Sequence, residues 1–140
     1  MATFNKIQEF VEKIAHGAVN LGSNQIMFAL TNTVPNPATM VNHQDLTGEV
    51  TYTNLDPNRN IVTTSSGQTA GKYELFLTNK EFSASGGGIG PFRYVVLYAY
   101  IDGTADPLIG YFDYGSEVTM NDGDSFTIEF DQVNGAVTFQ

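Results

Sequence analysis

The sequence predicts a mainly β protein, a single-domain antiparallel β-sandwich of jelly-roll-like or barrel-like form with one amphipathic α-helix near its N-terminus. Two observations predict this fold. The spacing of apolar residues changes from a helical period to a period of 2 at residue 25. From there on, about eight short strand-like segments follow one another at intervals of about 8 to 12 residues, separated by turn residues. The 140 residues suit one domain whose core needs neither disulfide nor metal, and no linker or repeat divides residues 1–140.

The first segment, residues 3–18, has a helical pattern. Its apolar residues recur at spacings of three, four and seven with polar residues between them, at Phe4, Ile7, Phe10, Val11, Ile14 and Ala18. Thr3 is the expected N-terminal cap, and Gly17 or Gly22 is expected to end the helix because glycine adopts the left-handed conformation readily. The pattern predicts an amphipathic helix of about four turns, packed on its own domain or docked on a partner.

The strands that follow are of two kinds. Residues 25–31, 72–78 and 125–130 alternate apolar with polar side chains, which predicts strands with one buried face. Residues 94–101 are apolar or aromatic at every position, which predicts a central strand covered on both faces. Further strands are expected at residues 108–114, 117–120 and 136–139, with weaker candidates at 61–64 and 49–53.

Turn residues lie between these segments. Asp102-Gly103 and Asp122-Gly123 are expected to form hairpin connections. Asn134-Gly135 is the strongest hairpin signal, and it is expected to join residues 126–130 to residues 137–139. Residues 31–48 and 53–60 contain prolines and asparagines with little periodicity, so we expect two long surface loops there.

Composition excludes several classes of function. Six Lys and Arg residues against fifteen Asp and Glu residues give a net charge of -9, which argues against nucleic acid as a partner. The absence of cysteine excludes disulfide frameworks, thiolate zinc sites and cysteine nucleophiles. No apolar run approaches about 18 residues and the N-terminus has no signal-peptide pattern, so we expect a soluble protein without a membrane partner.

Two motifs resemble ligand sites but lack the residues that such sites need. The glycine-rich run of residues 85–91 leads into a strand, whereas a phosphate loop leads into a helix, so we expect a tight or bulged connection. Asp122 and Asp124 flank Gly123, but the run of ligands of a calcium loop does not follow. We therefore expect neither cofactor nor metal.

Catalytic groups are not evident either. His16 and His43 are the two histidines, one on the polar face of the expected helix and one in a loop, and neither has the sequence context of a catalytic triad. We expect the protein not to be an enzyme. Arg93 is the last cation of the chain, and eight of the fifteen acidic residues follow it. It is expected to pair with a carboxylate, to stack on Phe92 or Tyr94, or to bridge to another subunit.

Candidate contacts with partners come from the apolar face of the expected helix, the last cation and two clustered tyrosines. These interface candidates are Phe4, Ile7, Phe10, Val11, Ile14, Arg93, Tyr111 and Tyr114.

Several blocks of the chain resemble a known family. They are ATFNK at residues 2–6, NLGS at 20–23, ALTNT at 29–33, IGPFRYVVLY at 89–98, DPLIGYFDYGS at 106–116 and NDGDSFT at 121–127. Together they resemble small structural proteins from the virion gene clusters of tailed bacteriophages. Residues 36–60 match least.

The resemblance implies a virion protein that is assembled in the host cytoplasm. Within that context we favour a capsid decoration, or cement, protein on the outer surface of the head, with the major capsid protein and other copies of itself, as a homotrimer, for partners. A tail component, in the tube, the terminator or the baseplate, is the alternative. A glycan-binding module, in which exposed tyrosines stack on sugar rings, is a further alternative.

Overall fold

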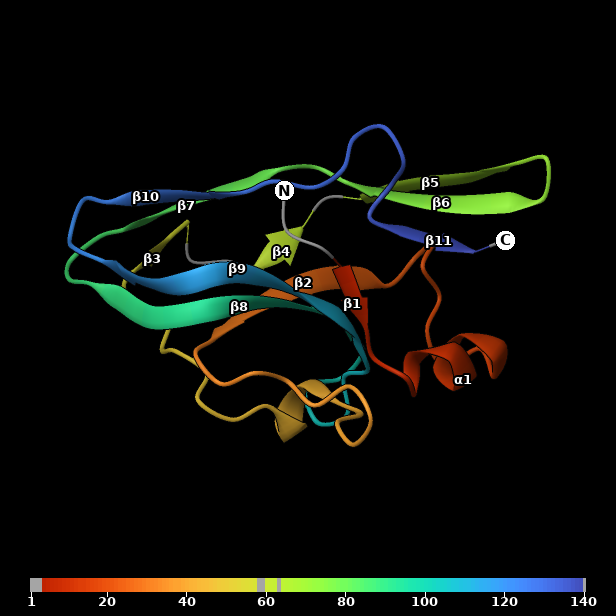
Figure 1. The fold of residues 1–140 in the computed structure, drawn as a ribbon, viewed down its shortest axis with the longest axis horizontal. Coiled ribbons are helices and arrows are strands. Elements are labelled where there is room, and N and C mark those ends of the chain that lie inside the picture. Colours follow the sequence, from red (N-terminus) through yellow and green to blue (C-terminus); the bar gives the residue numbers. More distant parts are fainter. Residues whose placement is uncertain (1–3, 58–59, 63, 140) are drawn as a thin grey trace.

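The computed structural model describes residues 4–57, 60–62 and 64–139, and its strands form two layers (Figure 1). The lower layer in the figure is a five-stranded sheet, and the upper layer consists of two three-stranded sheets. The strand pairs in these ranges are antiparallel. The predicted antiparallel β-sandwich is therefore confirmed.

The elements are as follows. In spatial order, the five-stranded sheet contains β1 (Phe4–Lys6), β9 (Leu108–Met120), β8 (Ile89–Tyr100), β2 (Gln25–Thr31) and β4 (Ile61–Val62). One three-stranded sheet contains β10 (Ser125–Ile128), β7 (Lys80–Ala84) and β3 (Leu55–Asp56), and the other contains β11 (Val137–Phe139), β6 (Lys72–Leu77) and β5 (Thr64–Thr69). The helices are α1 (Phe10–Ala15) and the 3-10 helix η1 (His43–Asp45).

Strand β8 lies at the centre of the five-stranded sheet, between β9 and β2, as its two-faced apolar pattern predicts. Its residues from Tyr94 to Ala99 are all buried. Successive side chains of a strand point to opposite faces. Both faces of the lower sheet must therefore be covered.

The upper face of this sheet is covered by aromatic contacts between the layers. Phe28 of β2 stacks on Phe82 of β7 with ring centroids 5.5 Å apart. Phe92 of β8 meets Phe126 of β10 edge to face at 5.3 Å. Phe28, Phe82 and Phe92 are at most 1% exposed, so the main core lies between the two layers.

The lower face is covered by the long connection after β2. This connection carries η1 and packs Met40, Leu46 and Val50 against the core. It is irregular, as predicted for residues 31–48, although Thr31 itself belongs to β2. The loop therefore acts as a partial third layer.

Three weaker predictions in this region need correction. A strand over residues 49–53 is wrong, because Glu49 forms only an isolated bridge to Thr31. The loop predicted over residues 53–60 contains the short strand β3. The strand predicted over residues 61–64 is present as β4 up to Val62, and Thr63 lies outside the described residues.

The predicted helix over residues 3–18 is wrong in its first half. Phe4–Lys6 form β1, which pairs with β9 opposite residues 110–112, and α1 has only 6 residues. Pairing with the edge of β9 gives the backbone of β1 hydrogen-bond partners and places the Phe4 ring 5.4 Å from Phe112. The expected cap, Thr3, lies outside the described residues. The helix ends at Ala15 with His16 as its C-cap, and Gly17, one of the two glycines expected to end it, follows with a φ of 73°.

Two of the three predicted hairpins are also wrong. Asp102-Gly103 lies in the connection between β8 and β9, which do pair. Asp122-Gly123 instead connects β9 to β10, which pairs with β7 in the other layer. Asn134-Gly135 precedes β11, which pairs with β6 rather than with β10. The turn chemistry is local, whereas the choice of partner strand depends on the two-layer packing.

The segments predicted at residues 108–114 and 117–120 form the single strand β9. The glycine-rich run of residues 85–91 is a connection only as far as residue 88, because β8 begins at Ile89 rather than at the predicted Tyr94, and the pairing with β9 shifts register between Ile89 and Phe92. Gly90 has a φ of 112°, and a Cβ atom on it would lie 2.8 Å from the Val118 carbonyl oxygen. The glycines there allow a close approach of two backbones.

The packing of β1 on β9 can be tested at Gly110. A Cβ atom at this position would collide with the Phe4 ring and would lie 2.6 Å from the Asn5 carbonyl oxygen. We predict that Gly110→Ala lowers the free energy of unfolding by about 1–3 kcal/mol. Hydrogen exchange of the β1 amides should become faster.

Gly67→Ala on β5 is the matched control, because a Cβ atom there meets nothing within 4 Å. This variant should unfold at nearly the same denaturant concentration as the wild type. Equal stability of the two variants would contradict the packing of β1.

Candidate functional site

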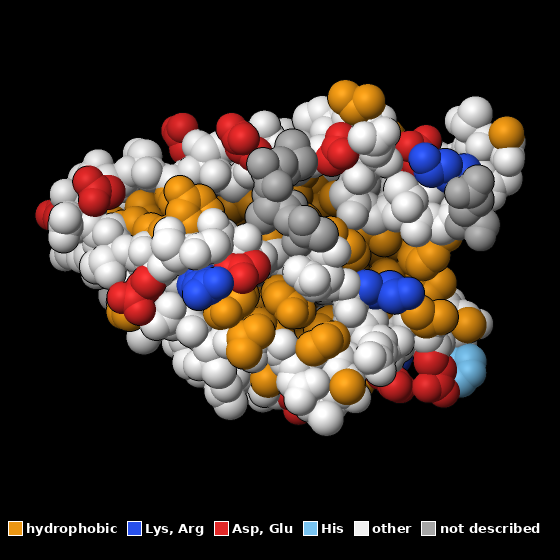
Figure 2. Space-filling view, in the orientation of Figure 1, with side chains coloured by type: hydrophobic (Ala, Val, Ile, Leu, Met, Phe, Trp, Pro, Cys, Tyr) orange, Lys and Arg blue, Asp and Glu red, His pale blue; other side chains and the backbone are white. Residues whose placement is uncertain are grey.

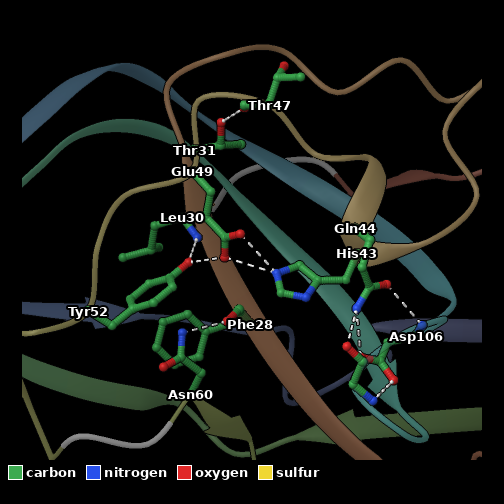
Figure 3. A network of polar contacts seen from close by, with 11 residues as sticks. Phe28, Leu30, Thr31, His43, Gln44, Thr47, Glu49, Tyr52, Asn60 and Asp106 are labelled. Atoms are coloured by element: carbon green, nitrogen blue, oxygen red, sulfur yellow. Dashed lines mark hydrogen bonds and ion pairs between the residues drawn. The ribbon is translucent and has the colours of Figure 1, made fainter.

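A polar cluster fastens the long connection to the lower face of the sheet (Figure 3). The His43 imidazole stacks on the ring of Tyr98 from β8, with centroids 4.0 Å apart and an angle of 6° between the planes. Its Nε2 lies 3.0 Å from both carboxylate oxygens of Glu49. The Tyr52 hydroxyl donates a hydrogen bond to Glu49 Oε2 at 2.5 Å. Three side chains of one loop are thus joined over a buried tyrosine.

The same cluster supplies hydrogen bonds to the edge of β2. Beyond β4, the Leu30 N–H donates to the Tyr52 hydroxyl at 2.9 Å, and the Leu30 carbonyl accepts from the Val50 N–H at 3.0 Å. At Phe28, the side-chain amide of Asn60 donates a hydrogen bond to the backbone carbonyl at 2.9 Å. Loop residues therefore replace a neighbouring strand.

A second group of contacts joins η1 to the connection between β8 and β9. The buried Asp106 carboxylate accepts hydrogen bonds through Oδ1 from the N–H groups of Ile101, Asp102 and Gly103 at 2.8–3.1 Å. Gln44 donates to its Oδ2 at 3.2 Å, and the Asp106 N–H donates to Gln44 Oε1 at 3.2 Å. Asp106 thus holds the turn and the loop together.

The pKa directions fit this structural role. Burial raises the pKa of Asp106, but the three N–H groups and the Gln44 amide outweigh it and leave the pKa below its usual value. Burial and the adjacent Glu49 carboxylate raise the pKa of Tyr52, so its hydroxyl stays protonated and donates to Glu49. The described contacts of His43, Glu49 and Tyr52 join these residues to one another, to β2, to Tyr98 of β8 and to the Asp106 carbonyl. We interpret the cluster as a clasp that holds the loop.

For His43 the sequence predicts surface solvation or a local hydrogen bond, and the structure shows the hydrogen bond, to Glu49, although His43 lies in η1 rather than in a loop. It does not single out Glu49, Tyr52 or Asp106. The spacing of His43, Glu49 and Tyr52 within ten residues is the available signal, but it has no period that marks a known motif.

The interface candidates separate by burial. Ile7 and Phe10 are 0% exposed and Tyr111 is 9% exposed, so these side chains belong to the core. Phe4 and Ile14 are half-buried and pack against it. The structure places only three of the eight at the surface, namely Val11 at 48% exposure, Tyr114 at 54% and Arg93, whose side chain is 40% exposed. Contact with a partner stays a prediction for these three.

Arg93 makes two of the contacts that the sequence predicts. Its Nε and Nη2 donate to the two oxygens of Asp113 at 2.8 and 3.1 Å, and its Cζ lies 5.5 Å from the centre of the Tyr94 ring. The hydrogen bonds from Arg93 and from the Gly115 N–H lower the pKa of Asp113. The pair therefore fixes the position of β9 against β8.

Next to this pair, β9 bulges outward. Phe92 lies opposite Val118 and Tyr94 lies opposite Asp113, so the four residues 114–117 of β9 face the single residue Arg93 of β8. Bulges re-aim side chains and interrupt strand pairing. Here Tyr114 points out of the sheet and contacts Phe126 of β10, with ring centroids 5.3 Å apart.

A groove runs between the two layers at this point. It has a volume of about 520 Å³ and is lined by Val95, Phe112, Asp113, Tyr114, Phe126, Thr127, Ile128 and Glu129. Figure 2 shows hydrophobic side chains exposed in the left half of the view, between the strands labelled β10 and β9 in Figure 1, with acidic side chains nearby. This aromatic groove is the candidate binding site.

A second hollow, of about 360 Å³, lies beside α1. Its walls include Ile14, Val19, Leu21, Tyr73 and Phe139. The Tyr73 hydroxyl is buried there without a hydrogen-bond partner in the described part of the chain. This hollow is smaller than the aromatic groove, and Phe139 in its lining belongs to β11, the edge strand of the other three-stranded sheet.

No family model, curated protein or solved structure matches this chain. The site is therefore interpreted from its own geometry. Among the residues that the structure describes, His, Asp and Glu form no group of three that could hold a metal ion. Within the same ranges, no helix has the length and apolar character needed to span a membrane.

The clasp can be tested at Tyr52. We predict that Tyr52→Phe lowers the free energy of unfolding by about 1–3 kcal/mol, because the Leu30 N–H loses its acceptor and Glu49 loses a donor. Tyr114→Phe is the control, since Tyr114 is 54% exposed. Chemical denaturation of both variants gives the comparison. Similar stabilities would contradict the clasp.

Asp106 should make stability depend on pH. Its pKa is lowered in the folded state, so its contribution is present above the usual aspartate value of about 3.9 and is lost as pH falls through the folded-state value. We predict that the wild type loses stability below about pH 4 and that Asp106→Asn loses less over the same range. Unfolding free energies measured from pH 7 downward would show this. Parallel curves for the two proteins would contradict the assignment.

Proposed function

We propose that this protein is a non-enzymatic structural protein of a tailed-bacteriophage virion, and that it binds the outer surface of the head shell as a decoration protein. The observation that carries the proposal is the aromatic groove between β9 and β10, which offers a binding surface at the open side of a rigid sandwich. The resemblance of the sequence blocks to phage virion proteins supplies the context. The partners are the major capsid protein and other copies of this chain.

The groove has the composition of a protein-binding surface. Interfaces combine an apolar, aromatic centre with a polar rim, and tyrosine is enriched at their centres. Here Phe112, Tyr114 and Phe126 form the centre, and Thr127 and Glu129 belong to the rim. Tyr114 is 54% exposed, so a partner would remove a large aromatic surface from water.

Assembly as a closed ring or trimer also fits the exposed strand edges of the fold. In the described ranges, β5 pairs with β6 alone. An unpaired edge invites uncontrolled pairing unless it is covered, and closed symmetry limits such contacts. We propose that neighbours on the shell provide this cover.

The proposal predicts that the purified protein adds to expanded, undecorated head shells. It should sediment with them and raise their melting temperature, because a ligand that binds only the assembled state stabilises it. Tyr114→Ala should bind more weakly, whereas Val133→Ala, at 82% exposure on a turn away from the groove lining, should bind like the wild type.

Failure of the wild type to bind any shell would overturn the head assignment. Immunogold labelling of intact particles that marks tails would instead place the protein in the tail tube, terminator or baseplate.

A second candidate function is that of a glycan-binding module. In the groove, Tyr114 contacts Phe126, and Glu129 lines the same groove. Aromatic faces stack on sugar rings, and carboxylates accept hydrogen bonds from sugar hydroxyls. A glycan array tests this second candidate. An array without signal would remove it.

A further inference from the structure

The aromatic groove ends on one side at a free strand edge. β10 has β7 as its strand partner within the described residues, and its other edge faces the groove. Such an edge carries backbone N–H and C=O groups that point away from the sheet without a ladder partner. A ligand that fills this groove therefore meets hydrogen-bonding groups as well as aromatic rings.

The opposite side of the groove does not offer the same edge. β9 bulges at residues 114–117, and the Gly115 N–H is already bonded to Asp113 Oδ1 at 2.8 Å. Bulges of this kind block regular strand pairing. At the bulge, the ring of Tyr114 lines the groove and contacts the ring of Phe126. The two sides of the groove therefore offer a ligand different contacts. The β10 side offers backbone hydrogen-bonding groups, and the β9 side offers side-chain contacts.

The charge around the groove is negative. Glu129 lines it, Asp124 precedes β10, and Glu81 lies opposite Thr127 on β7. Lys80 is the cation on the adjoining strand, opposite Ile128. Arg93 is already bound to Asp113. The groove therefore favours a ligand that carries Lys or Arg.

A second copy of this chain does not provide such a ligand. Its six cations are Lys6, Lys13, Arg59, Lys72, Lys80 and Arg93, and no two of them are closer than seven residues in sequence. An extended segment with a cation at alternate positions must come from another protein.

We propose that the edge of β10 accepts an extended, basic peptide segment of a partner protein as an additional strand, with apolar side chains of the segment on Tyr114 and Phe126 and its cations near Glu129 and Glu81. This inference rests on the proposed function, in which the shell protein supplies the segment. Strand addition of this kind draws affinity from main-chain hydrogen bonds and specificity from alternate side chains.

The direct test uses fluorescent synthetic peptides that alternate valine with lysine or arginine. These peptides should bind the full-length protein, and binding should weaken as salt is added. The same peptides with N-methyl groups on alternate backbone nitrogens keep their side chains but cannot form a ladder. Their affinity should be at least about tenfold lower.

Hydrogen exchange measured by NMR locates the bound peptide. With the unmodified peptide at saturation, amides at the outer edge of Ser125–Ile128 should exchange more slowly. Glu129→Gln should reduce affinity by about twofold to fivefold, as expected for a surface charge pair. Glu12→Gln, on α1 and away from the groove, is the matched control and should leave affinity unchanged.

Several results would overturn strand addition. These are an absence of binding by every peptide, equal affinity for the N-methylated forms, or unchanged exchange at β10 in the bound state. Displacement of the peptide by an oligosaccharide that leaves β10 exchange unchanged would assign the groove to sugars.

The two proposals fail separately. If the protein binds shells without protecting β10, the head assignment stands and strand addition fails. If the peptides bind at β10 while shells do not, strand addition stands and the head assignment fails.

Discussion

Burial of both faces of β8 is the constraint on which the rest of this structure depends. A strand that is apolar at every position from Tyr94 to Ala99 is stable only when material covers each side of its sheet. The two three-stranded sheets cover one side through stacked phenylalanines such as Phe28 and Phe82. The other side has no sheet to cover it in the described structure, so the long connection after β2 must do so.

A loop that covers a sheet face creates a hydrogen-bonding problem, since its own backbone and the edge of β2 both lose contact with water. Side chains supply the missing hydrogen-bond partners. Tyr52 of the clasp and Asn60 bind the edge of β2. Asp106 accepts from three N–H groups of the connection between β8 and β9, which is joined to η1 through Gln44. His43 and Glu49, whose side chains are 22% and 25% exposed, join Tyr52 to Tyr98 and so hold the same loop in place.

The proposed binding surface is the aromatic groove at the opening between the two layers. There β9 is long and bulged, β10 has an unpaired edge, and Tyr114 is exposed. Two carboxylates, Asp113 and Glu129, line the groove, and Asp113 is paired with Arg93. The strand addition proposed above would use the free edge of β10 and the exposed Tyr114 ring.

The sequence by itself determined the features that depend on neighbouring residues. These features are the β class, the central two-faced strand, a left-handed glycine just after the helix and a carboxylate or aromatic partner for Arg93, because alternation, left-handed glycine and charge act over a few positions. Only the tertiary structure decided what depends on residues far apart in the chain. The apolar spacing of Phe4 suits a helix, but pairing with β9 opposite Phe112 makes it a strand. Asn134-Gly135 forms a turn whichever strand follows, and packing sends β11 to β6. Glu49, Tyr52 and Asp106 meet β2 and η1 only after the sheet has formed, because local sequence signals carry no information on which edge remains to be paired.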